Sequence, residues 1–185
     1  MKLFFSKGLV IFFLLIGGLI SNAQVSSEQE KNLLYKHAIG AGAGFTTGYG
    51  LSYRYIPSKW GFQINFAPYY TKETERYSIG LTALYRLIES KVSSLFLYEG
   101  NHFYYDSYIT YYDPTNPQVV YMSGAAQNNL IKKRETENFV NNGIGVGIEF
   151  IIVKRIGFNL MGGYAFYRNF EQLNFTGETG LYYKF

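Results

Sequence analysis

Histidine, carboxylate and hydroxyl side chains come close together at one point of this sequence. The chain has two histidines, and His102 is followed by Asp106 and Ser107. These residue types serve acyl transfer, in which a base activates a hydroxyl nucleophile and an acid orients the base. Without further features of an active site, a polar strand end is the favoured explanation. The cluster leaves an enzymatic function open, and we assign no catalytic residue.

Metal, thiol and cofactor chemistry have little support. His37 and His102 are too few for a zinc site, and the chain has no cysteine, which excludes thiolate chemistry and disulfides. The glycine-rich runs 40–44 and 143–147 have a period of two and precede no helix, which favours strand interiors over phosphate-binding loops. With no large basic cluster, nucleic-acid binding is not expected. We expect no metal and no cofactor.

The first residues have the features of an export signal. Lys2 and Lys7 give a positive start, and a small-residue cleavage site ends at Ala23. The apolar run between them is shorter than the roughly 20 residues that a membrane-spanning helix needs. We predict a signal peptide over residues 1–23, a short periplasmic segment over 24–35 and one folded domain over 36–185.

Most of the remaining chain alternates between apolar and polar residues, which is the period of a β-strand. Short basic turns alternate with longer loops, which is typical of an up-and-down barrel. Eight strands are predicted, roughly over residues 36–45, 49–56, 60–71, 76–88, 93–105, 138–152, 155–168 and 173–185.

Lysine placement indicates which face of these strands points outward. A soluble lipocalin-like barrel would also alternate, with its polar face in water. Water-exposed sheets carry lysine freely, yet no lysine after residue 23 falls in the middle of a predicted strand. We therefore predict that the apolar face points outward and that the polar face, rich in Gly, Asn, Ser and Thr, lines a narrow lumen. The lumen is predicted to hold a charge network of Arg54, Arg86, Glu99, Glu149 and Glu178.

The pattern resembles the small bacterial outer-membrane β-barrel proteins of the OmpX and OmpA transmembrane-domain kind. The resemblance rests on the export signal, the eight segments and the aromatic-ended last strand. It implies an eight-stranded antiparallel transmembrane barrel in the cell outer membrane, in contact with lipids including lipopolysaccharide. It also implies that the barrel-assembly machinery reads the end of the chain, at Leu181, Tyr183 and Phe185. No periplasmic domain follows the barrel, so anchoring to peptidoglycan of the OmpA type is not implied.

The long connection over residues 106–137 is the best candidate for a specific function. Its β-rich runs 108–112 and 118–122 flank a turn that contains Pro114 and Pro117. We predict that the fifth and sixth strands extend above the membrane as a tyrosine-rich sheet that binds a surface protein or another ligand. The candidate recognition residues are Tyr108, Tyr111, Tyr112 and Tyr121, with Lys132, Lys133 and Arg134, which also suit lipopolysaccharide phosphates.

The sequence thus predicts a structural or surface-recognition barrel, not an enzyme, with side chains filling its lumen. One alternative is a lipid A-modifying outer-membrane enzyme of the acyltransferase or deacylase class, which His102, Asp106 and Ser107 would serve. The other is the soluble lipocalin-like ligand-binding barrel. In the preferred arrangement, aromatic residues mark the two lipid–water boundaries. These are Tyr55, Trp60, Tyr70, Tyr85 and Tyr167.

Overall fold

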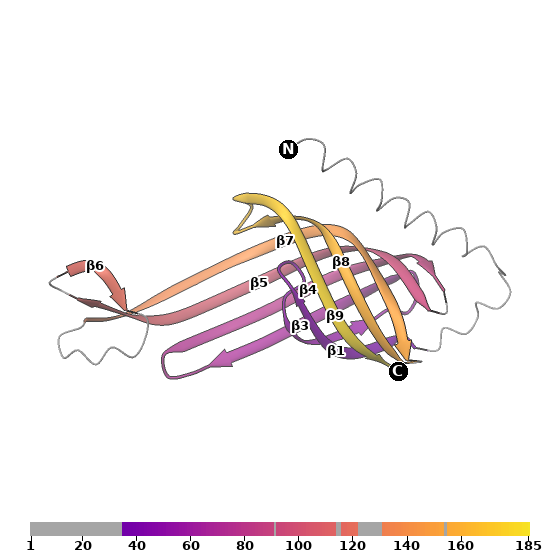
Figure 1. Cartoon of the computed structure of the whole chain (residues 1–185), viewed down its shortest axis with the longest axis horizontal. Coiled ribbons are helices and arrows are strands. Elements are labelled where there is room, and N and C mark those ends of the chain that lie inside the picture. Colours follow the sequence, from indigo (N-terminus) through magenta and orange to yellow (C-terminus); the bar gives the residue numbers. More distant parts are fainter. Residues whose placement is uncertain (1–34, 91, 114–115, 122–130, 154) are drawn as a thin grey trace. The chain divides into compact units, whose positions relative to one another are not determined.

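Eight antiparallel strands close into a ring in the computed structural model (Figure 1). The structure describes residues 35–90, 92–113, 116–121, 131–153 and 155–185. Successive strands of the ring are paired, and β1 pairs with β9 to close it. The short strand β6 pairs with β5 outside the ring. The strands are β1 (His37–Gly44), β2 (Gly50–Tyr55), β3 (Trp60–Tyr70), β4 (Thr74–Glu89), β5 (Ser93–Asp113), β6 (Asn116–Tyr121), β7 (Ile131–Val153), β8 (Ile156–Tyr167) and β9 (Gln172–Lys184).

The predicted fold, an all-β eight-stranded antiparallel up-and-down barrel, is confirmed by this ring of strand pairs. The predicted signal peptide and nearly all of the segment 24–35 lie outside the described residues. Within the part of the chain that is described, no helix has the length and apolar character needed to cross a membrane.

The barrel is polar inside and apolar outside. Inward residues such as Arg54 and Asn159 are 2% and 0% exposed, whereas the outward Leu51 and Leu81 are 72% and 54% exposed. Paired residues of neighbouring strands share a face, so the alternation within each strand sorts the whole wall into two surfaces. A water-soluble barrel has the opposite polarity. The predicted outward orientation of the apolar face is therefore confirmed.

The wall rises much higher on one side of the ring. The β5–β7 pairing continues as far as Tyr112 opposite Ile131, while β7 and β8 pair only up to Asn142 opposite Phe166. We call residues 106–113 of β5 and 131–137 of β7 the arm, which leaves the ring toward the left of Figure 1.

The predicted extension of the fifth and sixth strands is confirmed by the arm, while their predicted ends at residues 105 and 138 are wrong. The aromatic and β-branched residues beyond residue 105 continue the ladder without a break. The predicted hairpin is present too, with Tyr112 opposite Val120 on β6. The turn residues 114–115 and the side chain of Tyr121 lie outside the described part of the chain.

Candidate functional site: the plugged lumen and the arm

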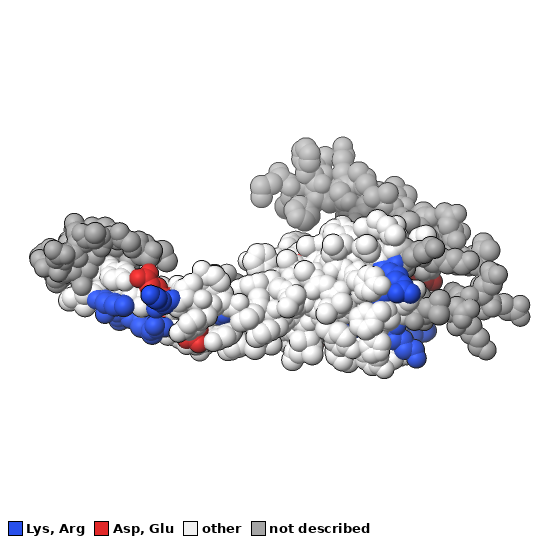
Figure 2. All heavy atoms as spheres, turned by 90° about the horizontal axis from the view of Figure 1, so that it is seen from below, with Lys and Arg blue, Asp and Glu red and all other residues white. Residues whose placement is uncertain are grey.

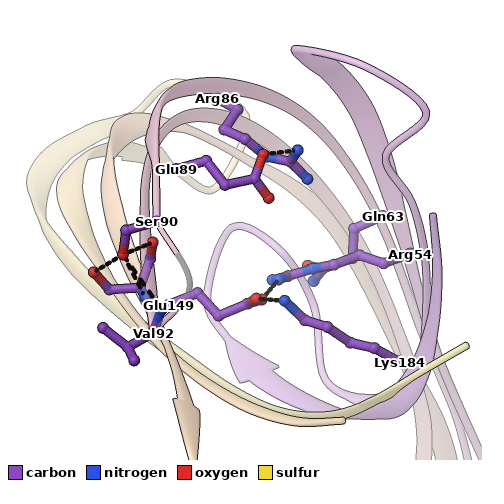
Figure 3. Close-up of polar contacts among 9 residues, drawn as sticks. Arg54, Gln63, Arg86, Glu89, Ser90, Val92, Glu149 and Lys184 are labelled. Carbon is purple, nitrogen blue, oxygen red and sulfur yellow. Dashed lines mark hydrogen bonds and ion pairs between the residues drawn. The ribbon is translucent and has the colours of Figure 1, made fainter. Parts of the chain in front are cut away.

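A buried ion-pair network lies inside the ring, with Glu149 at its centre (Figure 3). Arg54 Nη1 lies 2.7 Å from Glu149 Oε2, and Lys184 Nζ contacts the other carboxylate oxygen, Oε1. The Arg54 guanidinium also lies 4.0 Å from the centre of the Tyr182 ring. These contacts join β2, β7 and β9 across the lumen, so the network connects opposite parts of the wall.

Arg86 and Glu178 do not join this network. Arg86 pairs with Glu89, three residues further along the chain, and Figure 3 shows this pair apart from Glu149. Within the described residues, Glu178 forms no ion pair and instead accepts hydrogen bonds from the β1–β2 turn. The sequence singled out both residues, but their partners depend on how the turns fold. Lys184 and Glu89 were not predicted as members of the charged lumen.

The β1–β2 turn folds into the lumen as a plug, which we define as residues 45–49. The backbone amides of Thr46 and Thr47 donate to the two Glu178 carboxylate oxygens at 3.2 and 2.9 Å, and both threonine hydroxyls contact the same carboxylate. Both threonines are fully buried. A Cβ at Gly80 would overlap the Thr47 carbonyl, so a glycine at this position of β4 makes room for the plug. The sequence predicts only an outer loop here.

A chain of side-chain hydrogen bonds connects the plug to the ion-pair network. Arg54 Nε donates to Gln63 Oε1 at 2.8 Å, and Gln63 Nε2 donates to Asn65 Oδ1 at 3.0 Å. Asn65 Nδ2 then donates to the carbonyl of Gly48 in the plug at 3.0 Å. All three side chains are buried. This chain of buried polar groups therefore joins the plug to the ion-pair network through the lumen.

Glu99 is the exception among the predicted lumen residues. On β5 the inward side chains are Phe96, Tyr98 and His102, which places Glu99 on the opposite, outer face, where it is exposed. The prediction that Glu99 belongs to the lumen network is wrong. Both faces of this strand carry aromatic residues, so the alternation of β5 does not by itself reveal which face is inward.

His102, Asp106 and Ser107 do not form one site. His102 Nε2 lies 2.9 Å from Ser78 Oγ, and its Nδ1 lies 3.0 Å from the Phe45 carbonyl of the plug. Both side chains of this Ser–His pair are buried, so a substrate has no access to the hydroxyl. In the described residues, no three acidic or histidine side chains are grouped as a metal site.

The other two residues of that cluster have separate partners. Asp106 forms an ion pair with Arg76 at 2.7 Å and accepts a hydrogen bond from Tyr104. Ser107 Oγ accepts a hydrogen bond from Arg134 at 3.1 Å. The Asp106 contacts tie the base of the arm to the barrel, the Ser107 contact joins the two strands of the arm, and both resemble structural bonds more than catalytic ones.

Tyrosine hydroxyls and glutamates order the arm. Tyr112 donates to Glu135 at 2.8 Å, and Lys133 lies 2.8 Å from the same carboxylate. Hydrogen bonds from Lys133 and Tyr112 lower the pKa of Glu135, while a hydrogen bond to Glu73 raises the pKa of Tyr111. Glu135 is therefore charged and Tyr111 neutral at pH 7. The stabilisation of the arm by the Glu135 carboxylate is lost as the pH falls through the lowered pKa of Glu135. The stabilisation by the Tyr111 hydroxyl is lost as the pH rises through the raised pKa of Tyr111.

The basic residues of the arm are exposed. Lys132, Lys133 and Arg134 all face solvent, and Arg134 also reaches Ser107. In the face shown by Figure 2, charged side chains gather toward the two ends of the described molecule, and the wall between them is nearly free of charge. Tyr108, near the base of the arm, has its pKa raised by the neighbouring Glu137 carboxylate.

The end of the chain forms the closing seam of the ring. Leu181, Tyr183 and Phe185 are exposed on the outer face of the wall, and Phe185 exchanges backbone hydrogen bonds with His37. Their predicted role as an assembly signal stays a prediction. Of the predicted boundary aromatics, Trp60 packs on Tyr85 with ring centres 4.7 Å apart near the short turns.

A shallow depression of about 540 Å³ lies at the outer rim, beside the β8–β9 turn. Phe45, Phe139 and Arg168 are among the residues that line it. Arg168, Asn169 and Phe170 have φ values of 48°, 58° and 73°, a left-handed conformation that is costly for residues other than glycine. Asn169 holds this turn against β7 by accepting from the Val140 amide at 2.9 Å. Nothing in the alternation pattern predicts this turn.

Comparisons with known proteins give weak similarities. No protein-family model matches the chain, and no curated protein matches it. The N-terminal β-barrel domain of Pseudomonas aeruginosa OprF is 11% identical, with a TM-score of 0.47, and the match covers 80% of this chain and 95% of that one. Neisserial surface protein A is 14% identical, with a TM-score of 0.42 and coverages of 80% and 94%. Ail, the attachment invasion locus protein of Yersinia pestis, is 16% identical, with a TM-score of 0.41 and coverages of 80% and 96%.

These similarities are too low to assign a function, and the fold rests on the strand pairing itself. The ring of paired strands, its apolar outer face and its polar interior are mutually consistent. The chain is therefore an eight-stranded antiparallel up-and-down β-barrel whose lumen is filled by side chains and by the β1–β2 plug.

Proposed function

We propose that the protein is an outer-membrane β-barrel that recognises a protein partner at the cell surface through its arm. In this proposal residues 1–23 direct export, and the apolar outer face contacts lipid. The support is the inverted polarity of the wall. A barrel with exposed leucines on its outer face and a buried Arg54–Glu149 ion pair inside would be unstable in water. The aromatic residues Trp60 and Tyr85 suit the membrane boundary on the side of the short turns.

The observation that carries the recognition role is the unpaired edge of β7. One edge of this strand pairs with β5 throughout the arm, whereas the other edge pairs with β8 only from Asn142 onward. In the described residues, positions 131–139 therefore have no strand partner on that edge. An exposed edge binds an extended peptide by adding a strand. Lys132 and Lys133 discourage pairing with a second such edge and favour an acidic partner segment.

The filled lumen argues against transport. The plug and the polar chain from Gly48 to Glu149 occupy the interior, and eight strands leave little space beyond their own side chains. The barrel therefore serves as a rigid anchor, and the arm presents the binding surface.

Site-specific photo-crosslinking on intact cells tests the recognition role. A photoreactive amino acid at Lys132, on the unpaired edge, should yield one discrete crosslinked protein product. The same amino acid at Leu87, on the wall near the short turns, serves as the control and should not give that product. A photoreactive amino acid at Asn138, which is exposed on the same unpaired edge, should give the product in the full chain and lose it when residues 108–134 are trimmed. The trimmed barrel should stay folded, as judged by heat-dependent migration in gels. Identical products from Lys132 and Leu87, or none from Lys132, would contradict the proposal.

The lipid A-modifying alternative makes a different prediction. If the buried Ser78–His102 pair were catalytic, His102→Ala would change the lipid A mass spectrum of cells that express the protein. Under our proposal the spectrum is the same for the wild type, the variant and cells without the protein. The soluble alternative predicts that the mature chain dissolves without detergent, whereas a lipid-facing wall requires detergent or vesicles.

A further inference from the structure

A polar cluster lies on the outer face of the wall, among the apolar side chains that face away from the lumen. It consists of Glu99 and Asn101 on β5 and Asn142 on β7. The Asn101 amide donates to Glu99 Oε1 at 2.6 Å, and the Asn142 amide donates to Asn101 Oδ1. The register places Asn101 directly opposite Asn142. We call these three residues the wall cluster.

Apolar residues flank the wall cluster along and across the strands. Leu97 and Phe103 lie before and after it on β5, Leu81 lies opposite Asn101 on β4, and Ile144 lies opposite Glu99 on β7. All four are exposed on the outer face. The wall cluster therefore lies within the apolar band and not at its rim. In a membrane this surface meets hydrocarbon, where polar groups without partners are costly.

The wall cluster has hydrogen-bonding capacity that its own chain does not use. Glu99 Oε2 has no hydrogen-bond partner among the described residues, and the Asn101 and Asn142 amides each use one of their two N–H groups. Glu99 is exposed, and none of the ion pairs in the described part of the chain includes it. A single copy therefore leaves one oxygen of the Glu99 carboxyl group facing lipid with no partner among the described residues.

We propose that the wall cluster is the centre of an interface with a second copy of this chain inside the membrane. A two-fold interface brings the same patch against itself, so the patch must contain both donors and acceptors. The wall cluster meets this requirement, because Glu99 has an oxygen that can accept and the Asn101 and Asn142 amides each have a second N–H that can donate. The partner's Asn101 amide is suited to Glu99 Oε2. Ala83, opposite Glu99 on β4, is small and allows close approach.

This inference rests on the proposed membrane insertion, and cysteine crosslinking tests the two separately. The chain has no cysteine, so single cysteines can be introduced without further changes. Ala83→Cys lies beside the wall cluster, and Ala43→Cys is an outward alanine on β1 that serves as the matched control. In intact outer membranes treated with a short bis-maleimide, Ala83→Cys should give a dimer of this chain and Ala43→Cys should not.

Two further variants test the chemistry of the interface in the Ala83→Cys background. Glu99→Leu should lower the crosslinked dimer at least tenfold at equal expression, while Glu99→Gln, which keeps polar groups, should retain most of it. Equal crosslinking of Ala83→Cys and Ala43→Cys, a product with a different protein, or a dimer unaffected by Glu99→Leu would overturn the interface. Failure of the protein to fractionate with membranes or to show heat-dependent migration would instead overturn the membrane proposal.

Discussion

Individual charged residues have different roles because the barrel places them in different surroundings. Glu149 is surrounded by Arg54 and Lys184 inside the lumen, whereas Glu89 lies near the short turns with Arg86. Buried ion pairs add little net stability, but removing one partner leaves the other without compensation. Removing the carboxylate of Glu149 is therefore expected to destabilise the fold more than removing the carboxylate of Glu89.

Glu149→Ala should lower the free energy of unfolding by about 3–5 kcal/mol, because it leaves buried Arg54 and Lys184 without their carboxylate. The measurement is urea unfolding of protein refolded into lipid vesicles, followed by tryptophan fluorescence. Glu89→Ala serves as the control and should cost less, since its carboxylate is more exposed. The triple variant Arg54→Met/Glu149→Leu/Lys184→Met, which leaves none of the three charges without its partner, should recover most of the loss. Equal losses for the two single alanine variants would contradict this account of the lumen.

At the scale of elements, the β1–β2 turn shows how glycine placement shapes the lumen. Thr46 and Thr47 enter the ring and are held there by Glu178 on β9. The turn fits because Gly80 has no side chain where the Thr47 carbonyl lies. Gly177, by contrast, faces outward with open space around its Cα. The two glycines are both strand residues but differ in what a side chain would meet.

Gly80→Ala should lower the free energy of unfolding by about 1–3 kcal/mol, because the added methyl group displaces the plug. Gly177→Ala should be neutral or slightly stabilising, since alanine restricts the unfolded chain more than glycine. Urea unfolding in vesicles measures both effects. Hydrogen exchange of the Thr46 and Thr47 amides should accelerate in Gly80→Ala alone. Unchanged exchange in that variant would show that the plug does not depend on this glycine.

At the scale of the whole molecule, the orientation of the wall decides where the protein resides. Apolar residues cover the outside, and the polar core runs from the plug to Glu149. The arm adds an unpaired strand edge on one side only. In the proposed function, the barrel is anchored in lipid and the arm is presented to solvent.

The loss of stability caused by an arginine on the outer face should depend on its depth in the membrane, and this dependence tests the orientation of the wall. Leu160→Arg, in the middle of β8, should cost about 2–4 kcal/mol in lipid vesicles, while Val153→Arg, at the end of β7, should cost about 0–1 kcal/mol. Both residues are exposed, so a barrel in water would tolerate either change. Urea unfolding in vesicles compares the two variants. Equal and small costs would contradict a lipid-facing wall.

The sequence determined the strands of the ring, their order and, except on β5, their faces, because a period of two sorts the residues of a strand without any distant contact. It therefore predicted inward Arg54 and Glu149 and outward Leu81 and Leu160. It also predicted the extension of the fifth strand, because the β-rich run 108–112 follows residue 105. The second predicted run, 118–122, contributes to the separate strand β6, and residues 131–137 extend β7 instead.

Only the tertiary structure decided the features that depend on contacts between distant residues. Glu99 was misplaced because both faces of β5 carry aromatic residues, and only pairing with β4 and β7 fixes which face is inward. The plug depends on Glu178, which is more than 130 residues away from Thr46 and Thr47 in the sequence. The alternation of apolar and polar residues reflects the local geometry of a strand, whereas closure of the ring determines which residues become the partners of a buried charge.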